Sequence, residues 1–154
     1  MTTILALFTL ERPTMKVVSL IFILFCIPLC AEYLRDANKQ VVLDSTTKLM
    51  WQDNDTGDSM NWERAQESCS TLVLGGYNDW RLPSFEELKT LVADTKVSPV
   101  NSPVFKKALP CVYWSSSEHA KTKSNVWAIF FLDGTIYANP KTGNHFTRCV
   151  RNAQ

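Results

Sequence analysis

One stretch, residues 74–88, most constrains what this chain can fold into. It reads Leu-Gly-Gly-Tyr-Asn-Asp-Trp-Arg-Leu-Pro-Ser-Phe-Glu-Glu-Leu. The glycine pair and the Asn-Asp step favour turns, and the residue before Pro83 is pushed out of the helical region. Ser84 and Glu87 have the spacing of a capping box, which predicts a helix that begins at Phe85. The stretch therefore predicts a turn, an extended segment and a helix start in direct succession.

The remainder of the chain mixes strand and helix signals. Val41–Leu43 and Lys48–Trp51 flank a polar turn and predict an opening hairpin. Asn61 can cap a helix whose apolar residues recur at intervals of three and four. The second helix is expected to end near Asp94, and an irregular loop is expected to follow up to Leu109. Further strands are expected at 112–115, 126–132, 135–137 and 146–151, with the Asp-Gly step at 133–134 as a hairpin turn.

The N-terminus has the features of an export signal. A basic residue precedes an apolar run, Val17–Leu29, which is shorter than the ~20 residues that a membrane-spanning helix needs. We expect cleavage at the end of residues 1–31; alternatives are that translation starts at Met15 and that Cys30 carries a lipid. The sequence thus predicts a single domain at 32–154, exported to the periplasm or cell surface, with no transmembrane anchor after cleavage.

Charge and cysteine content narrow the partners and the compartment. The formal net charge of +1 argues against nucleic acid as a partner. Cys26 and Cys30 belong to the predicted leader, so Cys69, Cys111 and Cys149 remain, which allows one bridge and one free thiol. Export to an oxidising space favours the bridge. The sequence leaves the oligomeric state open.

Five motifs, in one order, resemble a known family. They are Trp51-Gln52, a helix from Trp62 to Cys69, the 75–84 stretch with Glu87-Leu88, Tyr113-Trp114-Ser115-Ser116-Ser117, and Arg148-Cys149-Val150-Arg151. Together they look like the C-terminal domain of the Lcl collagen-like adhesins, long catalogued as a domain of unknown function. That family is similar in fold to C-type lectins and formylglycine-generating enzymes. The resemblance implies an α+β, C-type lectin-like fold with two helices packed on twisted antiparallel strands.

The resemblance also implies a disulfide and a class of ligand. In C-type lectin folds a bridge ties the first helix to the closing strand, and here that bridge would join Cys69 to Cys149. The adhesins use this domain to bind sulfated glycans, so polysaccharide is a candidate partner, with surface protein as another. Without a Gly-x-y stalk in this chain, the trimer of those adhesins is not implied. The candidate ligand contacts are basic residues that could attract acidic glycan, namely Lys106, Lys107, His119, Lys121 and Lys123.

Residues within the motifs themselves are expected to be structural. An arginine beside a buried tryptophan or on a closing strand is expected to pair with a carboxylate such as Glu87 rather than with a ligand. The predicted structural set is Trp51, Trp62, Gly76, Trp80, Arg81, Pro83, Glu87, Trp114, Arg148 and Arg151.

Metal binding has little support in the sequence. The turn that follows Gln52 looks like the start of a calcium loop, but its Gly57 stands one position too early for an EF-hand. The Glu-Pro-Asn and Gln-Pro-Asp triplets of calcium-dependent lectins are absent from the sequence. We therefore expect no cofactor, although Asp53, Asp55 and Asp58 could hold calcium in another geometry.

Catalysis has little support either. His119 and His145 stand in no recognisable motif, and Ser115–Ser117 lacks the nucleophile elbow of the α/β-hydrolases. Formylglycine-generating enzymes need a cysteine pair, whereas the implied bridge would leave only Cys111, which we expect to be a buried small hydrophobe. The sequence thus predicts a noncatalytic binding module of the bacterial envelope. The alternatives are a formylglycine-generating type of oxidative enzyme and a structural envelope protein that binds only protein.

Overall fold

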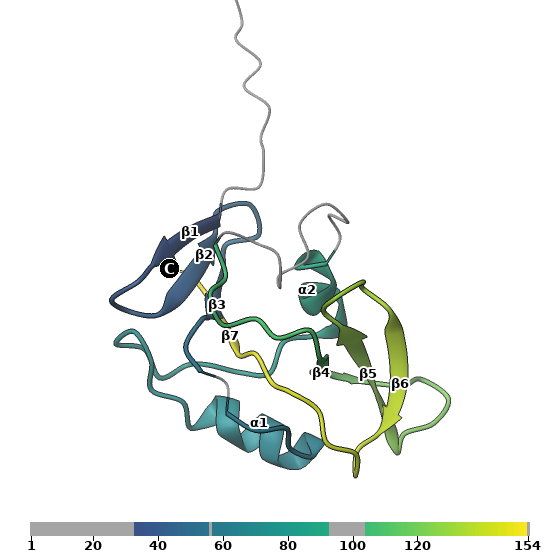
Figure 1. The fold of residues 1–154 in the computed structure, drawn as a ribbon. Coiled ribbons are helices and arrows are strands. Elements are labelled where there is room, and N and C mark those ends of the chain that lie inside the picture. The colour runs from purple at the N-terminus through teal and green to yellow at the C-terminus, as the bar shows by residue number, and fades with distance from the viewer. Residues whose placement is uncertain (1–32, 56, 93–103, 154) are drawn as a thin grey trace, which may run out of the picture.

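A computed structural model describes residues 33–55, 57–92 and 104–153 (Figure 1). The predicted leader lies outside these ranges. The described elements are β1 (Tyr33–Asp36), β2 (Val41–Asp44), β3 (Leu49–Gln52), α1 (Trp62–Ser70), α2 (Phe85–Thr90), β4 (Val112–Glu118), β5 (Asn125–Phe130), β6 (Ile136–Pro140) and β7 (Val150–Asn152). Within this part of the chain, no helix is long and apolar enough to cross a bilayer.

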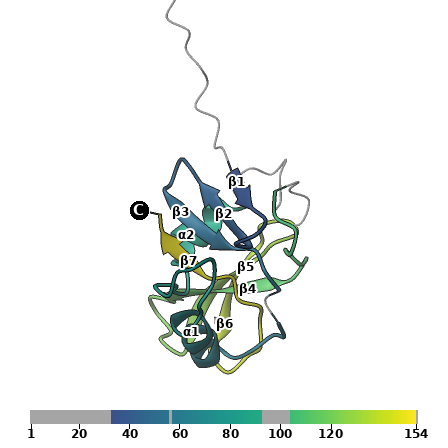
Figure 2. The same cartoon turned by 90° about the vertical axis from the view of Figure 1, so that its left-hand side faces the viewer.

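The first sheet has the order β1-β2-β3-β7 and is antiparallel throughout (Figure 2). The predicted hairpin is confirmed, with Val42 opposite Trp51, and Asp44 fixes its turn by accepting the backbone N–H groups of Thr46 and Thr47. The sequence did not predict β1, because its turn to β2 lacks glycine and instead places Gln40 at a φ of 56°.

The second sheet, in the order β4-β5-β6, lies between the two helices. Successive side chains of a strand point to opposite faces. Trp114 therefore packs with Ala65 and Cys69 of α1, whereas Tyr113 packs with Leu88 of α2. The two helices thus bury opposite faces of one sheet, and this produces two adjoining apolar cores.

The segment before β7 joins the two sheets. Phe146 forms a parallel bridge with Tyr113 of β4, and only from Val150 does the chain pair with β3. The predicted strand from residue 146 to 151 was therefore too long, because its first half pairs with one sheet and its second half with the other. A Cys69–Cys149 disulfide ties α1 to this segment, which is the bridge expected of a C-type lectin-like fold.

The central stretch folds as its sequence signals predict. Gly75 and Gly76 both take positive φ, and the Ser84–Glu87 capping box is formed. The helix that follows is shorter than predicted: α2 ends at Thr90, and the chain then tightens into i to i+3 bonds at Leu91 and Val92. With two helices and antiparallel sheets, the predicted α+β class is confirmed.

Candidate functional site

A buried carboxylate fixes the backbone of the most basic loop segment. Asp53 follows β3 and is almost fully buried. Its carboxylate accepts the backbone N–H groups of Lys106 and Lys107 at 3.0 and 3.2 Å. It also accepts Nε of Arg35, from β1, at 2.6 Å. Asp53 therefore accepts three donors at once and links β1 to the Lys106–Lys107 segment.

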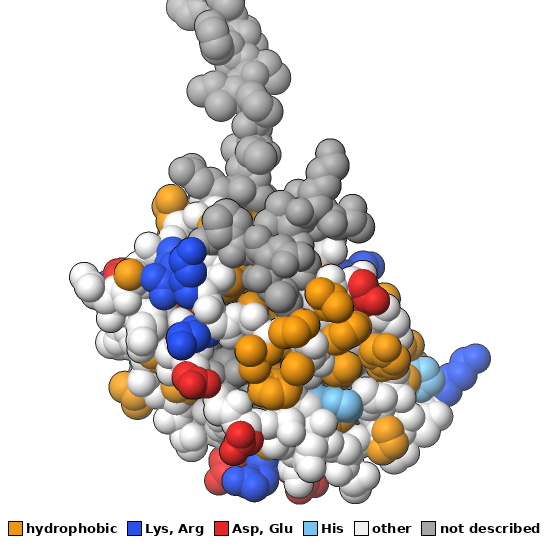
Figure 3. Space-filling view, viewed as in Figure 1, with side chains coloured by type: hydrophobic (Ala, Val, Ile, Leu, Met, Phe, Trp, Pro, Cys, Tyr) orange, Lys and Arg blue, Asp and Glu red, His pale blue; other side chains and the backbone are white. Residues whose placement is uncertain are grey.

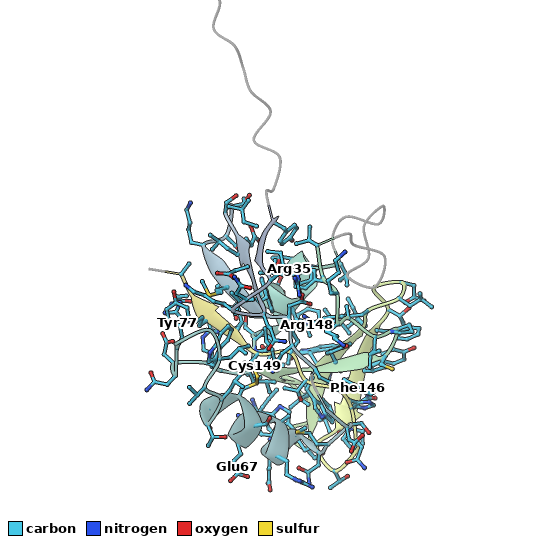
Figure 4. The ribbon with its side chains drawn as sticks, turned by 60° about the vertical axis from the view of Figure 1, so that its left-hand side comes forward. Arg35, Glu67, Tyr77, Phe146, Arg148 and Cys149 are labelled. Atoms are coloured by element: carbon cyan, nitrogen blue, oxygen red, sulfur yellow. A yellow bond between two sulfur atoms is a disulfide. The ribbon has the colours of Figure 1, made fainter. Side chains whose placement is uncertain are left out.

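A buried arginine holds the same segment from the other side. Arg148 is fully buried and donates to the backbone carbonyl oxygens of Gln52 and Lys107. Its guanidinium lies 5.0 Å from the centre of the Phe105 ring and 3.6 Å from the Asp53 carboxylate. Burial lowers the pKa of Arg148, yet a guanidinium stays protonated in proteins. We call Asp53 and Arg148 the buried anchor; Figure 4 shows Arg148 beside Arg35.

Above the buried anchor, three cations form what we call the basic rim: Arg35, Lys106 and Lys107. Both lysine side chains are exposed, while that of Arg35 is partly covered. Among the described residues, no carboxylate lies within ion-pair distance of Lys106 or Lys107. Figure 3 shows Lys and Arg side chains gathered over this side of the molecule. The rim is thus a positive surface on a backbone that is fixed from below.

The other predicted cations lie in the β4–β5 loop, residues 119–124. His119 contacts the Trp127 ring edge-on at 4.8 Å between ring centres, and its Nδ1 accepts the backbone N–H of Thr122. Lys123 pairs with Glu118 at 3.6 Å, and so does Lys141 at 2.5 Å. Lys121 is exposed. Glu118 therefore offsets part of the positive charge of this loop.

The structure does not bring the five predicted ligand residues together. The segment that carries Lys106 and Lys107 runs beside β3 on the left of Figure 1, whereas the β4–β5 loop projects at the right-hand end of the domain. A single contact surface made of all five residues would need the two segments to lie side by side. The β4–β5 connection is too short for that, because it turns directly from Glu118 to Asn125 and is closed by a bond from His119 N to Asn125 O.

The three candidate calcium ligands are also separated by their environments. The Asp53 carboxylate points into the protein, where it is already occupied by Arg35 and two amides. Asp55 and Asp58 are exposed, and Asp55 accepts the N–H of Gly57. Within the described ranges, no three acidic, histidine or cysteine side chains form a metal-binding group.

The motif arginines pair with carboxylates, as predicted. Arg81 donates two bonds of 2.7 Å to Glu87, and Arg151 donates to Asp79 at 2.6 and 3.1 Å while its guanidinium lies 3.8 Å from the centre of the Tyr77 ring. The remaining motif residues lie in the cores or in the turns that support them. Trp51, Trp80 and Trp114 are buried, and Gly76 takes positive φ in the turn before Trp80. Trp62 donates to Ser115 O, and Pro83 O accepts from Ser116 N.

A family model for the Lcl C-terminal domain matches residues 40–151. The chain belongs to the Lcl C-terminal domain family. This confirms the resemblance inferred from the five motifs. No curated protein matches the chain. A crystal structure of botrocetin is similar, with 15% sequence identity and a TM-score of 0.44, over 69% of this chain and 92% of botrocetin.

Two residues of this Lcl domain's basic site escaped the sequence analysis. Arg35 lies on β1, a strand that was not predicted, and Asp53 was considered only as a calcium ligand. One sequence feature could have indicated that Asp53 is buried. It directly follows the apolar strand that carries Trp51, and a carboxylate in such a position is buried beside a cation. Its partners, at residues 106, 107 and 148, are too distant in sequence for any local pattern to reveal them.

The described part of the chain contains one free thiol. Cys69 and Cys149 are bonded to each other, which leaves Cys111 as the free cysteine among the described residues. Cys111 is partly exposed rather than buried, contrary to our expectation.

Substituting Arg81 is expected to lower the free energy of unfolding and to make that free energy less dependent on pH in the acidic range. Arg81→Ala should cost about 1 kcal/mol, because the pair with Glu87 is charge-assisted and bidentate but half exposed. Bonds from Arg81 hold the pKa of Glu87 below its ordinary value. That contribution to stability is complete at neutral pH, above the ordinary glutamate pKa, and is lost as the pH falls through the lowered pKa of Glu87.

The measurement is urea unfolding at neutral and acidic pH, with Lys89→Ala as the control. Lys89 forms an ion pair on the same helix with Glu86, at 3.8 Å, but both side chains are largely exposed, so its loss should be near zero. Equal stability of Arg81→Ala and wild type at neutral pH would refute a structural role for Arg81.

Proposed function

We propose that this protein is an exported, noncatalytic binding module that holds acidic or sulfated glycan on its basic rim. The single observation that carries the proposal is the anchoring of the Lys106–Lys107 backbone by Asp53 and Arg148. A site that is held in place before binding loses less conformational entropy when a ligand arrives. The leader predicted from the sequence and the disulfide support export.

Electrostatics favour the basic rim over the β4–β5 loop as the contact surface. At the rim, Asp53 contacts Arg35, buried Arg148 and the backbone of Lys106 and Lys107, and among the described residues no carboxylate pairs with either lysine side chain. In the loop, Glu118 faces both Lys123 and Lys141. Sulfate and carboxylate groups are attracted by summed positive charge, and this attraction weakens as salt screens it. The rim therefore offers the stronger field even though the whole chain is nearly neutral.

A noncatalytic role fits the groups that surround the rim. Asp53 and Arg148 are buried and committed to structural bonds, so neither is placed to exchange a proton with a bound substrate. The side chains of Lys106 and Lys107 carry positive charge, and among the described residues neither is paired with a general base or a nucleophile. The rim can hold an anionic chain, and its side chains offer no chemistry that would cleave one.

The two pairs of lysines provide a matched test. Lys106→Ala/Lys107→Ala removes the same charge as Lys121→Ala/Lys123→Ala, so a difference between them reports position and not net charge. The first variant should bind immobilised sulfated polysaccharide roughly thirtyfold more weakly, since it loses two contacts that each contribute about 1 kcal/mol in water. The second variant should bind almost like wild type. Binding is measured across a salt series, in which wild type should weaken as salt rises.

Two outcomes would contradict the proposal. Wild type that fails to bind any sulfated or carboxylated polysaccharide at low salt would exclude the ligand class. Equal losses of glycan affinity in the two double-lysine variants would show that the glycan does not bind preferentially at the rim. Thermal melts of both variants should match wild type, because only exposed side chains are changed while the backbone amides that Asp53 accepts remain.

A further inference from the structure

Among the described residues, no strand pairs with the outer edge of β6. β6 is the last strand of the β4-β5-β6 sheet and lies at the right-hand margin of the domain in Figure 1. Phe130 N donates to Thr135 O and Lys141 N donates to Ser124 O, so with the observed register Tyr137 and Asn139 direct their backbone groups towards β5. The N–H and C=O groups of Ile136, and the N–H of Ala138, are thus directed away from the sheet.

Apart from Pro140 at its C-terminal end, this edge lacks the devices that protect other edges of the fold. Edge strands normally carry charges, bulges or a cover that prevents pairing with another chain. β1 carries Arg35 and Asp36, and the outer edges of β7 and β4 are bonded by Arg81 and Phe146 respectively. By contrast, β6 reads Ile-Tyr-Ala-Asn-Pro and carries no charge. Two of its large apolar side chains are exposed, Ile136 by 46% and Tyr137 by 40%.

We propose that β6 pairs with β6 of a second copy of this chain. The two strands run antiparallel about a two-fold axis at Tyr137, and the two three-stranded sheets become one continuous sheet. The interface is self-complementary, as two-fold symmetry requires. Backbone pairing supplies the affinity, and the side chains on each face fix the register.

The backbone groups select this register over its neighbours. With Tyr137 opposite itself, Ile136 of one copy faces Ala138 of the other, and each exchanges N–H and C=O bonds with its partner. Ala138 O already accepts Asn125 Nδ2, but a carbonyl has a second lone pair. One alternative register sets Ile136 opposite Pro140, which has no N–H. The other sets Ala138 opposite Gly134, whose N–H is already donated to Phe130 O.

The side chains agree with the same register. Tyr137 meets Tyr137 of the second copy across a non-hydrogen-bonded pair, where Cα atoms lie about 4.5 Å apart and aromatic side chains contact each other well. Beyond the strand ends, Asp133 of one copy stands opposite Lys141 of the other, which places opposite charges together on both sides of the axis. The pairing therefore covers both exposed apolar side chains and is complementary in charge.

Charge substitution at Tyr137 tests the pairing directly. Because the residue faces itself, Tyr137→Lys places two like charges in contact, and Tyr137→Glu does the same with the opposite sign. Each variant alone, expressed from the full-length sequence, should weaken self-association at least about tenfold. An equimolar mixture of the two should restore association, since lysine then faces glutamate. Sedimentation velocity over a wide concentration range measures all three samples against wild type.

A control variant and a crosslink complete the test. Val73 is 74% exposed and lies outside β6, so Val73→Lys removes an apolar surface residue of similar kind and should leave association unchanged. In a Cys111→Ser background, Tyr137→Cys should oxidise to a crosslinked dimer, because opposed Cα atoms of such a pair fall within disulfide range. Wild type that stays monomeric at the highest concentration, or a lysine–glutamate mixture that fails to associate, would overturn the proposal.

Discussion

Replacing Cys69 and Cys149 together with alanine is expected to lower the free energy of unfolding by roughly 3–5 kcal/mol. The bridge closes a loop with a sequence separation of 80 residues, and a crosslink over such a loop removes entropy mainly from the unfolded chain. Both cysteines are fully buried, so the variant also loses packing between α1 and the segment that joins the two sheets. Urea unfolding at neutral pH measures the loss.

Cys111→Ala serves as the control for this disulfide variant. Cys111 is unbonded and partly exposed, so its substitution should cost well under the value for the bridge. Treatment of wild type with a thiol reductant should reproduce the loss seen in the double variant and leave the double variant itself unaffected. A double variant as stable as Cys111→Ala would show that the bridge contributes nothing to the fold.

Local signals in the sequence were enough to predict most elements. The capping box at Ser84, the polar turn after Asp44 and the Asp133-Gly134 step each act over a few residues, and each is present in the structure. Two features were missed, β1 because its turn to β2 lacks a glycine signal and the segment at Phe146 because it depends on a distant partner. β1 exists through its pairing with β2, and the segment at Phe146 leaves the first sheet because β4 offers it a parallel bridge.

In the candidate site, too, local sequence features were predicted and contacts between distant residues were not. Exposed lysines are visible in any sequence, so Lys106 and Lys107 were predicted as contacts. What sets them apart from Lys121 and Lys123 is the buried anchor beneath them, and its members are far apart in the chain. Residue type alone could not show that Asp53 faces inward while Asp55 faces solvent, because burial is decided by the whole fold.

Replacing Asp53 with alanine is expected to cost about 3–5 kcal/mol in unfolding free energy. Arg148 is fully buried, and removing its carboxylate neighbour leaves an uncompensated charge in the interior, which is strongly destabilising. The backbone N–H groups of Lys106 and Lys107 also lose their acceptor. Asp55→Ala is the matched control: this exposed aspartate in the same turn accepts the N–H of Gly57 and, among the described residues, has no other bond. It should change stability by about 0.5 kcal/mol or less.

A double-mutant cycle separates the charge pair from the lost backbone bonds. In Asp53→Ala/Arg148→Met, the buried charge and its counter-charge leave together, so the double variant should be destabilised by less than the sum of the two single variants. The coupling measured by urea unfolding should be at least about 1 kcal/mol. Strict additivity would show that Asp53 and Arg148 act independently. The anchor would then be two separate supports for the loop, one that accepts its amides and one that donates to its carbonyl oxygen.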